Sequence, residues 1–307
     1  SDLAGNAGTA VTASTDSSDV TFDKTAPTLP IVSLLSSSSA YSYAKEGTDI
    51  TISMLASEAI SEPEVTFWSG GVLIADTRVT YVESTANPSR GWDAMYSTAA
   101  GDTEGSVTFS IAFSDLAGNV GTPVTASTNN NTMTFDKTAP TLSSVVIASN
   151  NSTPTLAKEG DVITLTITPS EAISTPVINL QLGGVDIADA SIAYVDTSGS
   201  AGTAWTAAYT TAAGDTGGAV TYSIAFSDLA GNAGTAVTAS TDSSVVTFNN
   251  STPTLNNVSI ASNNANTTQA KVDDVITLTM TASEAISTPM INLQVGGIAI
   301  ADASITY

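Results

Sequence analysis

Acidic and amide side chains recur along the chain in three short motifs whose oxygen atoms could hold a calcium ion. In one copy Asp136 lies in Phe-Asp-Lys-Thr-Ala-Pro, Glu171 in Ser-Glu-Ala-Ile-Ser, and Asp228 in Ser-Asp-Leu-Ala-Gly-Asn. Calcium binds roughly six to eight oxygens from carboxylates, amides, backbone carbonyls and water. Clustered carboxylates repel one another unless a cation joins them. The predicted calcium ligands form two equivalent sets, Asp23, Glu58, Asp115 and Asn119, and Asp136, Glu171, Asp228 and Asn232.

The motifs recur because the chain is a tandem array with a period of 113 residues. Asp23, Asp136 and Asn249 occupy the same place in successive copies. A fixed period indicates repeated structural units. Because Asn249 stands where the other copies have Asp, we expect the third copy to bind calcium more weakly or through a different ligand set. The predicted domains are the end of one repeat at 1–23, complete repeats at 24–136 and 137–249, and the first part of a further repeat at 250–307.

Hydrophobic patterning predicts an all-β fold. Residues 162–168, 205–209 and 220–226 alternate apolar and polar side chains, which is typical of strands with one buried face. No useful length of the chain shows a helical period. About seven short strands in a repeat of this size predict a two-sheet sandwich of immunoglobulin type. Further predicted strands of the second complete repeat are 145–147, 177–182, 187–195 and 245–248.

The strand order of such a sandwich brings the acidic motifs to one pole. Successive antiparallel strands place alternate loops at opposite ends, so loops 169–174, 196–203 and 227–232 should meet beside the incoming linker. The sequence therefore predicts calcium sites where one repeat joins the next. A local interpretation stays open, because Asp, Asn and Gly also favour turns for reasons of their own backbone geometry.

Composition limits the partners and the chemistry. The chain has 29 acidic and 7 basic residues and a net charge of -22, which disfavours nucleic acid and anionic lipid and favours cations. It has no cysteine and no histidine, so disulfides, the usual zinc or haem sites and the nucleophile-base pairs of those residues are excluded. We expect no enzymatic activity. No apolar run reaches transmembrane length, and we expect no direct membrane insertion of this segment.

The combined motifs resemble a known family. The sequences Asp-Lys-Thr-Ala-Pro-Thr-Leu, Ser-Glu-Ala-Ile-Ser and Phe-Ser-Asp-Leu-Ala-Gly-Asn, at these spacings, resemble the bacterial immunoglobulin-like tandem repeats of giant surface adhesins. That family includes biofilm-associated proteins and type I-secreted adhesins of the repeats-in-toxin class. The resemblance covers the whole chain. It implies an extracellular stalk at the cell surface, in which neighbouring repeats contact one another and calcium bound by the two ligand sets stiffens the joints.

Two alternative functions remain open from the sequence. The chain could be a subunit of a self-assembling filament, sheath or surface layer, with other copies of the protein as lateral partners. It could instead be a carbohydrate-binding module that uses Trp68, whose counterpart in the next repeat is Gln181. Trp92 and Trp205 occupy equivalent positions and are expected to pack in the cores.

Overall fold

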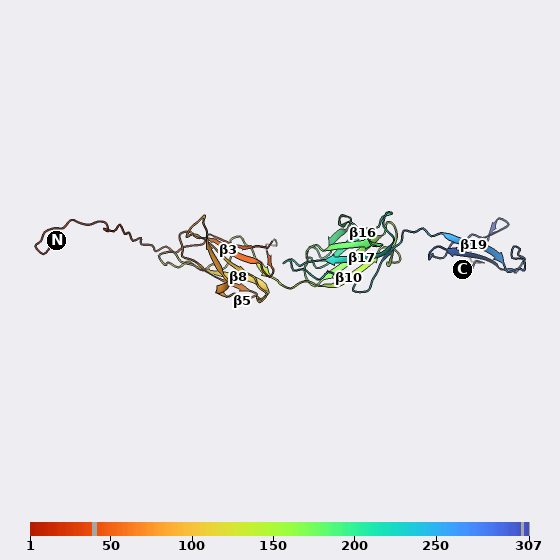
Figure 1. The fold of residues 1–307 in the computed structure, drawn as a ribbon, viewed down its shortest axis with the longest axis horizontal. Helices are drawn as coiled ribbons and strands as arrows, with labels where there is room; N and C mark the ends of the chain where they lie inside the picture. Colours follow the sequence, from red (N-terminus) through yellow and green to blue (C-terminus); the bar gives the residue numbers. More distant parts are fainter. Residues whose placement is uncertain (39–41, 302–303, 307) are drawn as a thin grey trace.

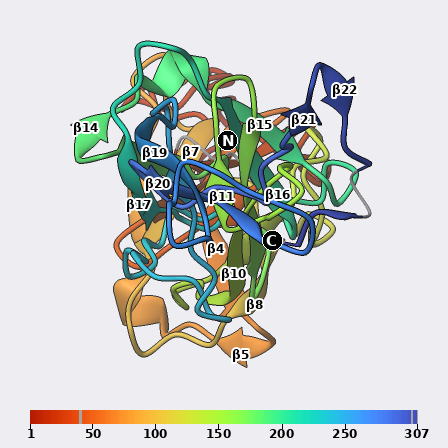
Figure 2. The same ribbon diagram turned by 90° about the vertical axis from the view of Figure 1, so that its right-hand side faces the viewer.

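The computed structural model describes residues 1–38, 42–301 and 304–306, and the regular secondary structure of these residues consists almost entirely of short β-strands. Two sandwiches follow one another along the longest axis, and residues 250–301 lie beyond the second (Figure 1). In the view along that axis, the successive repeats overlap (Figure 2). Among the described residues no helix is long and apolar enough to span a membrane.

The first sandwich consists of two sheets. The first sheet has the strand order β1-β3-β7-β6, and the second has the order β2-β9-β8-β4-β5. All pairs are antiparallel except β2 with β9. The strands are β1 (Ile31–Ser36), β2 (Tyr43–Ala44), β3 (Asp49–Leu55), β4 (Glu64–Ser69), β5 (Val72–Leu73), β6 (Thr80–Glu83), β7 (Gly91–Ser97), β8 (Gly105–Ala112) and β9 (Met133–Phe135), with a 3-10 turn η1 (Asp76–Arg78).

The second sandwich repeats this topology. Its sheets have the orders β10-β12-β16-β15 and β11-β18-β17-β13-β14, and again one short pair, β11 with β18, is parallel. This strand order is that of an immunoglobulin-like domain. It confirms the predicted all-β fold of tandem immunoglobulin-like sandwiches. The strands are β10 (Leu142–Ser149), β11 (Leu156–Ala157), β12 (Val162–Pro169), β13 (Val177–Leu182), β14 (Val185–Asp186), β15 (Ala193–Asp196), β16 (Trp205–Thr210), β17 (Gly218–Ala225) and β18 (Thr247–Phe248), with η2 (Asp189–Ser191).

The two ends of the chain carry less structure. Residues 1–30 contain no strand, and residues 250–301 form two hairpins. The apolar side chains of the first hairpin, such as Val258 and Ile260, are exposed. The strands of these hairpins are β19 (Leu255–Ser262), β20 (Ile276–Ala282), β21 (Gln294–Val295) and β22 (Ile298–Ala299).

Alternation along the strands builds a separate core in each sandwich. In β12, Ile163, Leu165 and Ile167 are buried, while the threonines between them face outward. The same pattern on the facing sheet supplies the other half of the core. Trp205 is buried in this core, and Trp92 packs against the core of the first sandwich. Both tryptophans therefore contribute to packing.

One predicted strand is wrong in its extent. Residues 187–195 do not form a continuous strand, because the chain changes sheets within them. Strand β14 belongs to the sheet of β13, whereas β15 pairs with β16 in the other sheet. The turn η2 makes the crossing. The predicted strand 245–248 is shorter than expected, and residues 150–161, which are not among the predicted strands, contain β11.

An ion pair in the first sandwich has no counterpart in the second. The carboxylate of Asp102 accepts two hydrogen bonds from the guanidinium of Arg78. In the second sandwich Ser191 replaces this arginine, and the equivalent carboxylate of Asp215 accepts a hydrogen bond of 2.9 Å from the hydroxyl of Tyr209. The carboxylate at this position thus has different donors in the two sandwiches, and it is buried in the first and half-buried in the second.

We expect Arg78→Ala to destabilise the first sandwich by about 2 kcal/mol, because it leaves the buried carboxylate of Asp102 without its cation. Burial alone would raise the pKa of Asp102, but donors from Arg78 and the Ala99 amide outweigh it and hold the pKa below its ordinary value. The stabilisation is therefore present above the unfolded pKa and is lost as the pH falls through the folded pKa. Denaturant unfolding measures it, with Ser191→Ala as the matched control; equal effects of the two variants would contradict this assignment.

Candidate calcium site at the joints

Three carboxylates converge where the two sandwiches meet, at a place that we call the second joint. Asp136, Glu171 and Asp228 each place a carboxylate oxygen within 4.8 Å of the others. Asp228 is 3% exposed, and the other two side chains are half-buried. The structure thus brings together the three acidic residues of this predicted set. Their mutual repulsion, in a partly buried place, is what a divalent cation would relieve.

The linker residue Asp136 is held by both sandwiches. Its backbone N–H donates to the carbonyl of Ala44 in the first sandwich, at 2.9 Å. Its own carbonyl accepts a hydrogen bond of 2.9 Å from Nδ2 of Asn232 in the second sandwich. The carboxylate of Asp136 therefore sits at a fixed point between the two bodies.

The other two carboxylates are positioned by the core of the second sandwich. Glu171 lies two residues before Ile173, which is fully buried and forms an isolated bridge with Asp228. The N–H of Ile173 also donates to the carbonyl of Gly202, at 3.0 Å. The three loops predicted to share one pole therefore meet there.

Asp228 is locked within a tight loop. Its two carboxylate oxygens accept hydrogen bonds from the N–H and from Nδ2 of Asn232, both at 2.8 Å. Gly231 supports the turn with a φ of +90°, which favours glycine. The same pattern joins Asp2 and Asn6, at 2.9 and 2.8 Å, in a part of the chain without strands. The loop itself is thus a local turn, but local turns do not explain the convergence with Asp136 and Glu171.

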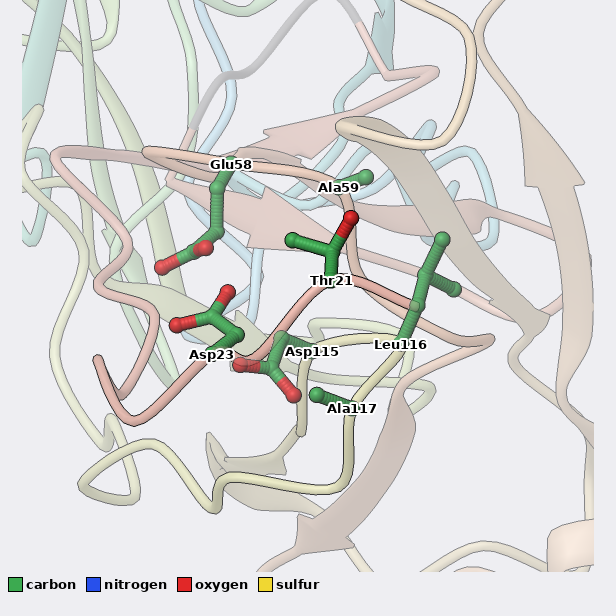
Figure 3. Close-up of a pocket in the computed structure, with 7 residues that line it drawn as sticks. All are labelled: Thr21, Asp23, Glu58, Ala59, Asp115, Leu116 and Ala117. Atoms are coloured by element: carbon green, nitrogen blue, oxygen red, sulfur yellow. The ribbon is translucent and has the colours of Figure 1, made fainter. Parts of the chain in front are cut away.

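The first joint, at Asp23, repeats this geometry. The carboxylates of Asp23, Glu58 and Asp115 lie within 4.8 Å of one another, and Asp115 is 4% exposed. They line an open surface pocket together with Thr21, Ala59, Leu116 and Ala117 (Figure 3). Figure 3 shows the carboxylates of Glu58 and Asp23 directed toward each other, with that of Asp115 close to Asp23.

The two predicted amide ligands have a positioning role in the structure. Nδ2 of Asn119 donates to Asp115 at 2.7 Å and to the carbonyl of Asp23 at 3.3 Å, as Asn232 does in the second joint. Each asparagine thereby ties the linker to the loop that carries the buried carboxylate. Ligation of a cation by the side-chain oxygens of Asn119 and Asn232 stays a prediction.

Electrostatics at the second joint fit a cation-binding role. Burial raises the pKa of Asp136, and the nearby charges of Asp228 and Glu104 raise it further against a hydrogen bond from the Thr138 amide. Burial and then the charges of Asp136, Asp228 and Glu104 raise the pKa of Glu171. Burial is the largest cause of both shifts, and repulsion from the neighbouring carboxylates adds to it.

Glu104 is a residue of this joint that the sequence did not reveal. It comes from the first sandwich, and its Oε1 accepts hydrogen bonds from the N–H of Lys137, at 2.9 Å, and from Oγ1 of Thr138, at 2.7 Å. Its counterpart in the next repeat is Gly217, so it belongs to no repeated motif. Only its position just before β8 places it near the joint.

Two lysines add further contacts across the second joint. Nζ of Lys137 donates to the carbonyls of Ala100 and Asp102, at 2.6 and 2.8 Å, which fixes the linker to the first sandwich. Nζ of Lys45 in the first sandwich donates to the carbonyl of Gly231 in the second, at 3.0 Å. Lys137 therefore tethers the linker to the first sandwich, and Lys45 joins the two sandwiches directly.

The raised pKa values of Asp136 and Glu171 give a pH prediction for the metal-free protein. A carboxyl whose pKa is raised by folding destabilises the native state when it is ionised. Protonation of that carboxyl therefore stabilises the native state. We expect the second sandwich to gain thermal stability as the pH falls from neutrality through the raised pKa values of Asp136 and Glu171. Added calcium should remove this gain at pH values where it still binds. Calorimetric melting of metal-stripped protein checks this, and a monotonic loss of stability over the same range would contradict it.

Trp68 lies on β4 opposite Leu73 of β5 and is half-buried. The nearby side chain of Val72 is exposed. A sugar platform at Trp68 stays a prediction.

Comparison with solved structures finds matches of low sequence identity and low TM-score. The D1-D2 pair of Rst is 10% identical with a TM-score of 0.33, over 74% of this chain and 100% of that chain. The D00-D0 domain of intimin is 12% identical with a TM-score of 0.27, over 72% and 100%. The Ig1-2 module of the Drosophila receptor protein tyrosine phosphatase DLAR is 13% identical with a TM-score of 0.23, over 73% and 98%. Scores this low carry no functional argument.

No protein-family model matches the chain, and no curated protein matches it in sequence. The fold assignment therefore rests on the order of strands within the two sandwiches.

Proposed function

We propose that this chain is a spacer segment of an extracellular bacterial surface adhesin, in which calcium ions bound at the joints hold successive sandwiches in line. One observation carries the proposal: the same three carboxylates, one from the linker and two from the following sandwich, converge at two successive joints. The tandem fold and the resemblance of the motifs to adhesin repeats support the cell-surface assignment. The role is mechanical and requires no catalysis.

The ligand origins explain how a bound ion would act on the joint. Asp136 continues β9 and bonds to Ala44, so it moves with the first sandwich. Glu171 and Asp228 are fixed to the core of the second sandwich through Ile173. A cation held by all three would tie the two bodies together at one point. Without it, repulsion among the carboxylates favours opening of the joint.

The stiffness of the chain would depend on the calcium concentration of the compartment in which it lies. Extracellular calcium modules bind with dissociation constants of roughly 10⁻⁴ to 10⁻³ M. Sites of that affinity fill outside a cell and stay empty in a cytoplasm. The chain would then be flexible during export and would stiffen at the cell surface.

Small-angle X-ray scattering of the full chain tests this role. In millimolar calcium we expect an extended particle, and with a chelator a shorter maximum dimension and greater flexibility. Magnesium at equal concentration serves as the ionic-strength control, because its preference for a near-ideal octahedral site disfavours this cluster. Identical profiles with calcium and with chelator would disprove calcium stiffening. Lateral assembly into filaments and carbohydrate binding stay alternatives, and no specific contact among the described residues favours either.

A further inference from the structure

The third joint, between the second sandwich and β19, uses a different chemistry at the same place. Asn249 occupies the position of Asp136, and Glu284 occupies that of Glu171. Nδ2 of Asn249 donates a hydrogen bond to Oε2 of Glu284, at 2.6 Å. In the second joint the linker side chain and the loop carboxylate are both anions that lie close together. In the third joint the corresponding side chains are in direct contact.

The backbone frame around the two linker residues is the same. The N–H of Asn249 donates to the carbonyl of Ala157 at 2.8 Å, as that of Asp136 donates to Ala44. Oδ1 of Asn249 accepts from the N–H of Ser251 at 2.8 Å, as Oδ1 of Asp136 accepts from the N–H of Thr138. The third joint therefore differs from the second in side-chain chemistry, at an equivalent position of the linker.

This frame fixes which end of the Asn249 amide meets Glu284. The backbone N–H of Ser251 donates to the side-chain oxygen of Asn249, so the side-chain nitrogen is left facing the carboxylate of Glu284. A neutral amide removes one of the two negative charges and supplies a donor to the other. Both effects are what a cation would otherwise provide.

The next linker residue shows a related exchange. Lys137 binds the carbonyls of the preceding sandwich with its ammonium group, whereas Asn250 donates from Nδ2 to the equivalent carbonyl of Asp215, at 2.8 Å. At the position of Lys137, the amide of Asn250 makes the contact that an ammonium group makes in the second joint. At the position of Asp136, the amide of Asn249 makes the contact with the glutamate that a bound cation would make in the second joint.

From these contacts we infer that the residue at the first linker position decides whether a joint needs a cation: aspartate gives a calcium-dependent joint, and asparagine closes the joint directly through Glu284. The array would then combine two kinds of joint, and loss of calcium would loosen only the aspartate joints. The contrast between the joints rests on the calcium role proposed above, but closure by the amide does not.

A single substitution in the second joint tests this inference. In Asp136→Asn, the new amide should donate to Glu171 and close the joint without metal, whereas Asp136→Ala should neither bind calcium nor close it. The chain has no cysteine, so spin labels can be placed at Val82→Cys and Val195→Cys. These positions are equivalent in the two sandwiches, and the side chains are 57% and 52% exposed. Pulsed electron paramagnetic resonance then gives the distribution of distances across the joint.

We expect wild type to show a narrow distance distribution only with calcium, Asp136→Asn a narrow one with or without calcium, and Asp136→Ala a broad one in both conditions. If Asp136→Asn is as broad as Asp136→Ala while wild type responds to calcium, the inference fails and the calcium role survives. If wild type ignores calcium but Asp136→Asn is narrower than Asp136→Ala, the calcium role fails and closure by the amide stands. Thermal melting of each variant confirms that both sandwiches remain folded.

Discussion

Replacing Glu171 by Gln is expected to lower the calcium affinity of the second joint about 100-fold, because calcium affinity follows the number of charged ligands. The substitution keeps the size and shape of the side chain. In the described part of the chain Glu171 accepts no hydrogen bond from the protein, so its charge can be removed without breaking the fold. Isothermal titration of calcium into the full chain measures the affinity.

Two matched variants sharpen this test. Glu58→Gln should weaken the first joint and leave the second unchanged, since the two clusters are equivalent but separate. Glu284→Gln should leave calcium binding unaltered, because its joint pairs the carboxylate with Asn249 instead of with other acids. Calcium binding that is equal in wild type and Glu171→Gln would contradict the assignment of this residue as a ligand.

Replacing Asn232 by Ala is expected to reduce calcium affinity at the second joint about 10- to 100-fold, the range typical of residues that orient metal ligands. Its Nδ2 holds the carbonyl of Asp136 and the carboxylate of Asp228 at once. The substitution removes both bonds and lets the linker move away from the loop. Titration calorimetry and the width of the label distance distribution should change together.

Asn6 provides the control for this variant. It makes the same hydrogen bonds to Asp2 that Asn232 makes to Asp228, but it lies in a strand-free part of the chain, outside both carboxylate clusters. Asn6→Ala should therefore leave calcium binding unchanged. Calcium binding that is unaffected by Asn232→Ala would show that the loop holds its carboxylate without help from the amide.

Much of the fold could be predicted because the same sequence pattern occurs in two complete repeats. Alternation in 162–168 and 205–209 identified β12 and β16 closely, since one face of each strand is more buried than the other. The rule that alternate loops share a pole then placed Glu171 beside Asp228 without any distance information. The register of the linker follows from the same repeat, because Asp136 directly follows a core residue, Phe135.

Other features depend on single contacts that leave no pattern in the sequence. Glu104 reaches the second joint only because β8 begins beside the linker, and no motif marks it. The orientation of the Asn232 amide follows from two acceptors that come from different parts of the chain. The break between β14 and β15 arises because the chain must change sheets, which hydrophobic alternation alone does not indicate.

If both carboxylate clusters hold calcium, anomalous X-ray scattering from crystals grown in calcium should locate the ions. We expect an anomalous peak among Asp136, Glu171 and Asp228 and another among Asp23, Glu58 and Asp115, with oxygens at about 2.3 to 2.6 Å. We expect no peak between Asn249 and Glu284. Well-ordered carboxylates with no anomalous density between them, at calcium concentrations above those outside cells, would contradict calcium binding at these joints.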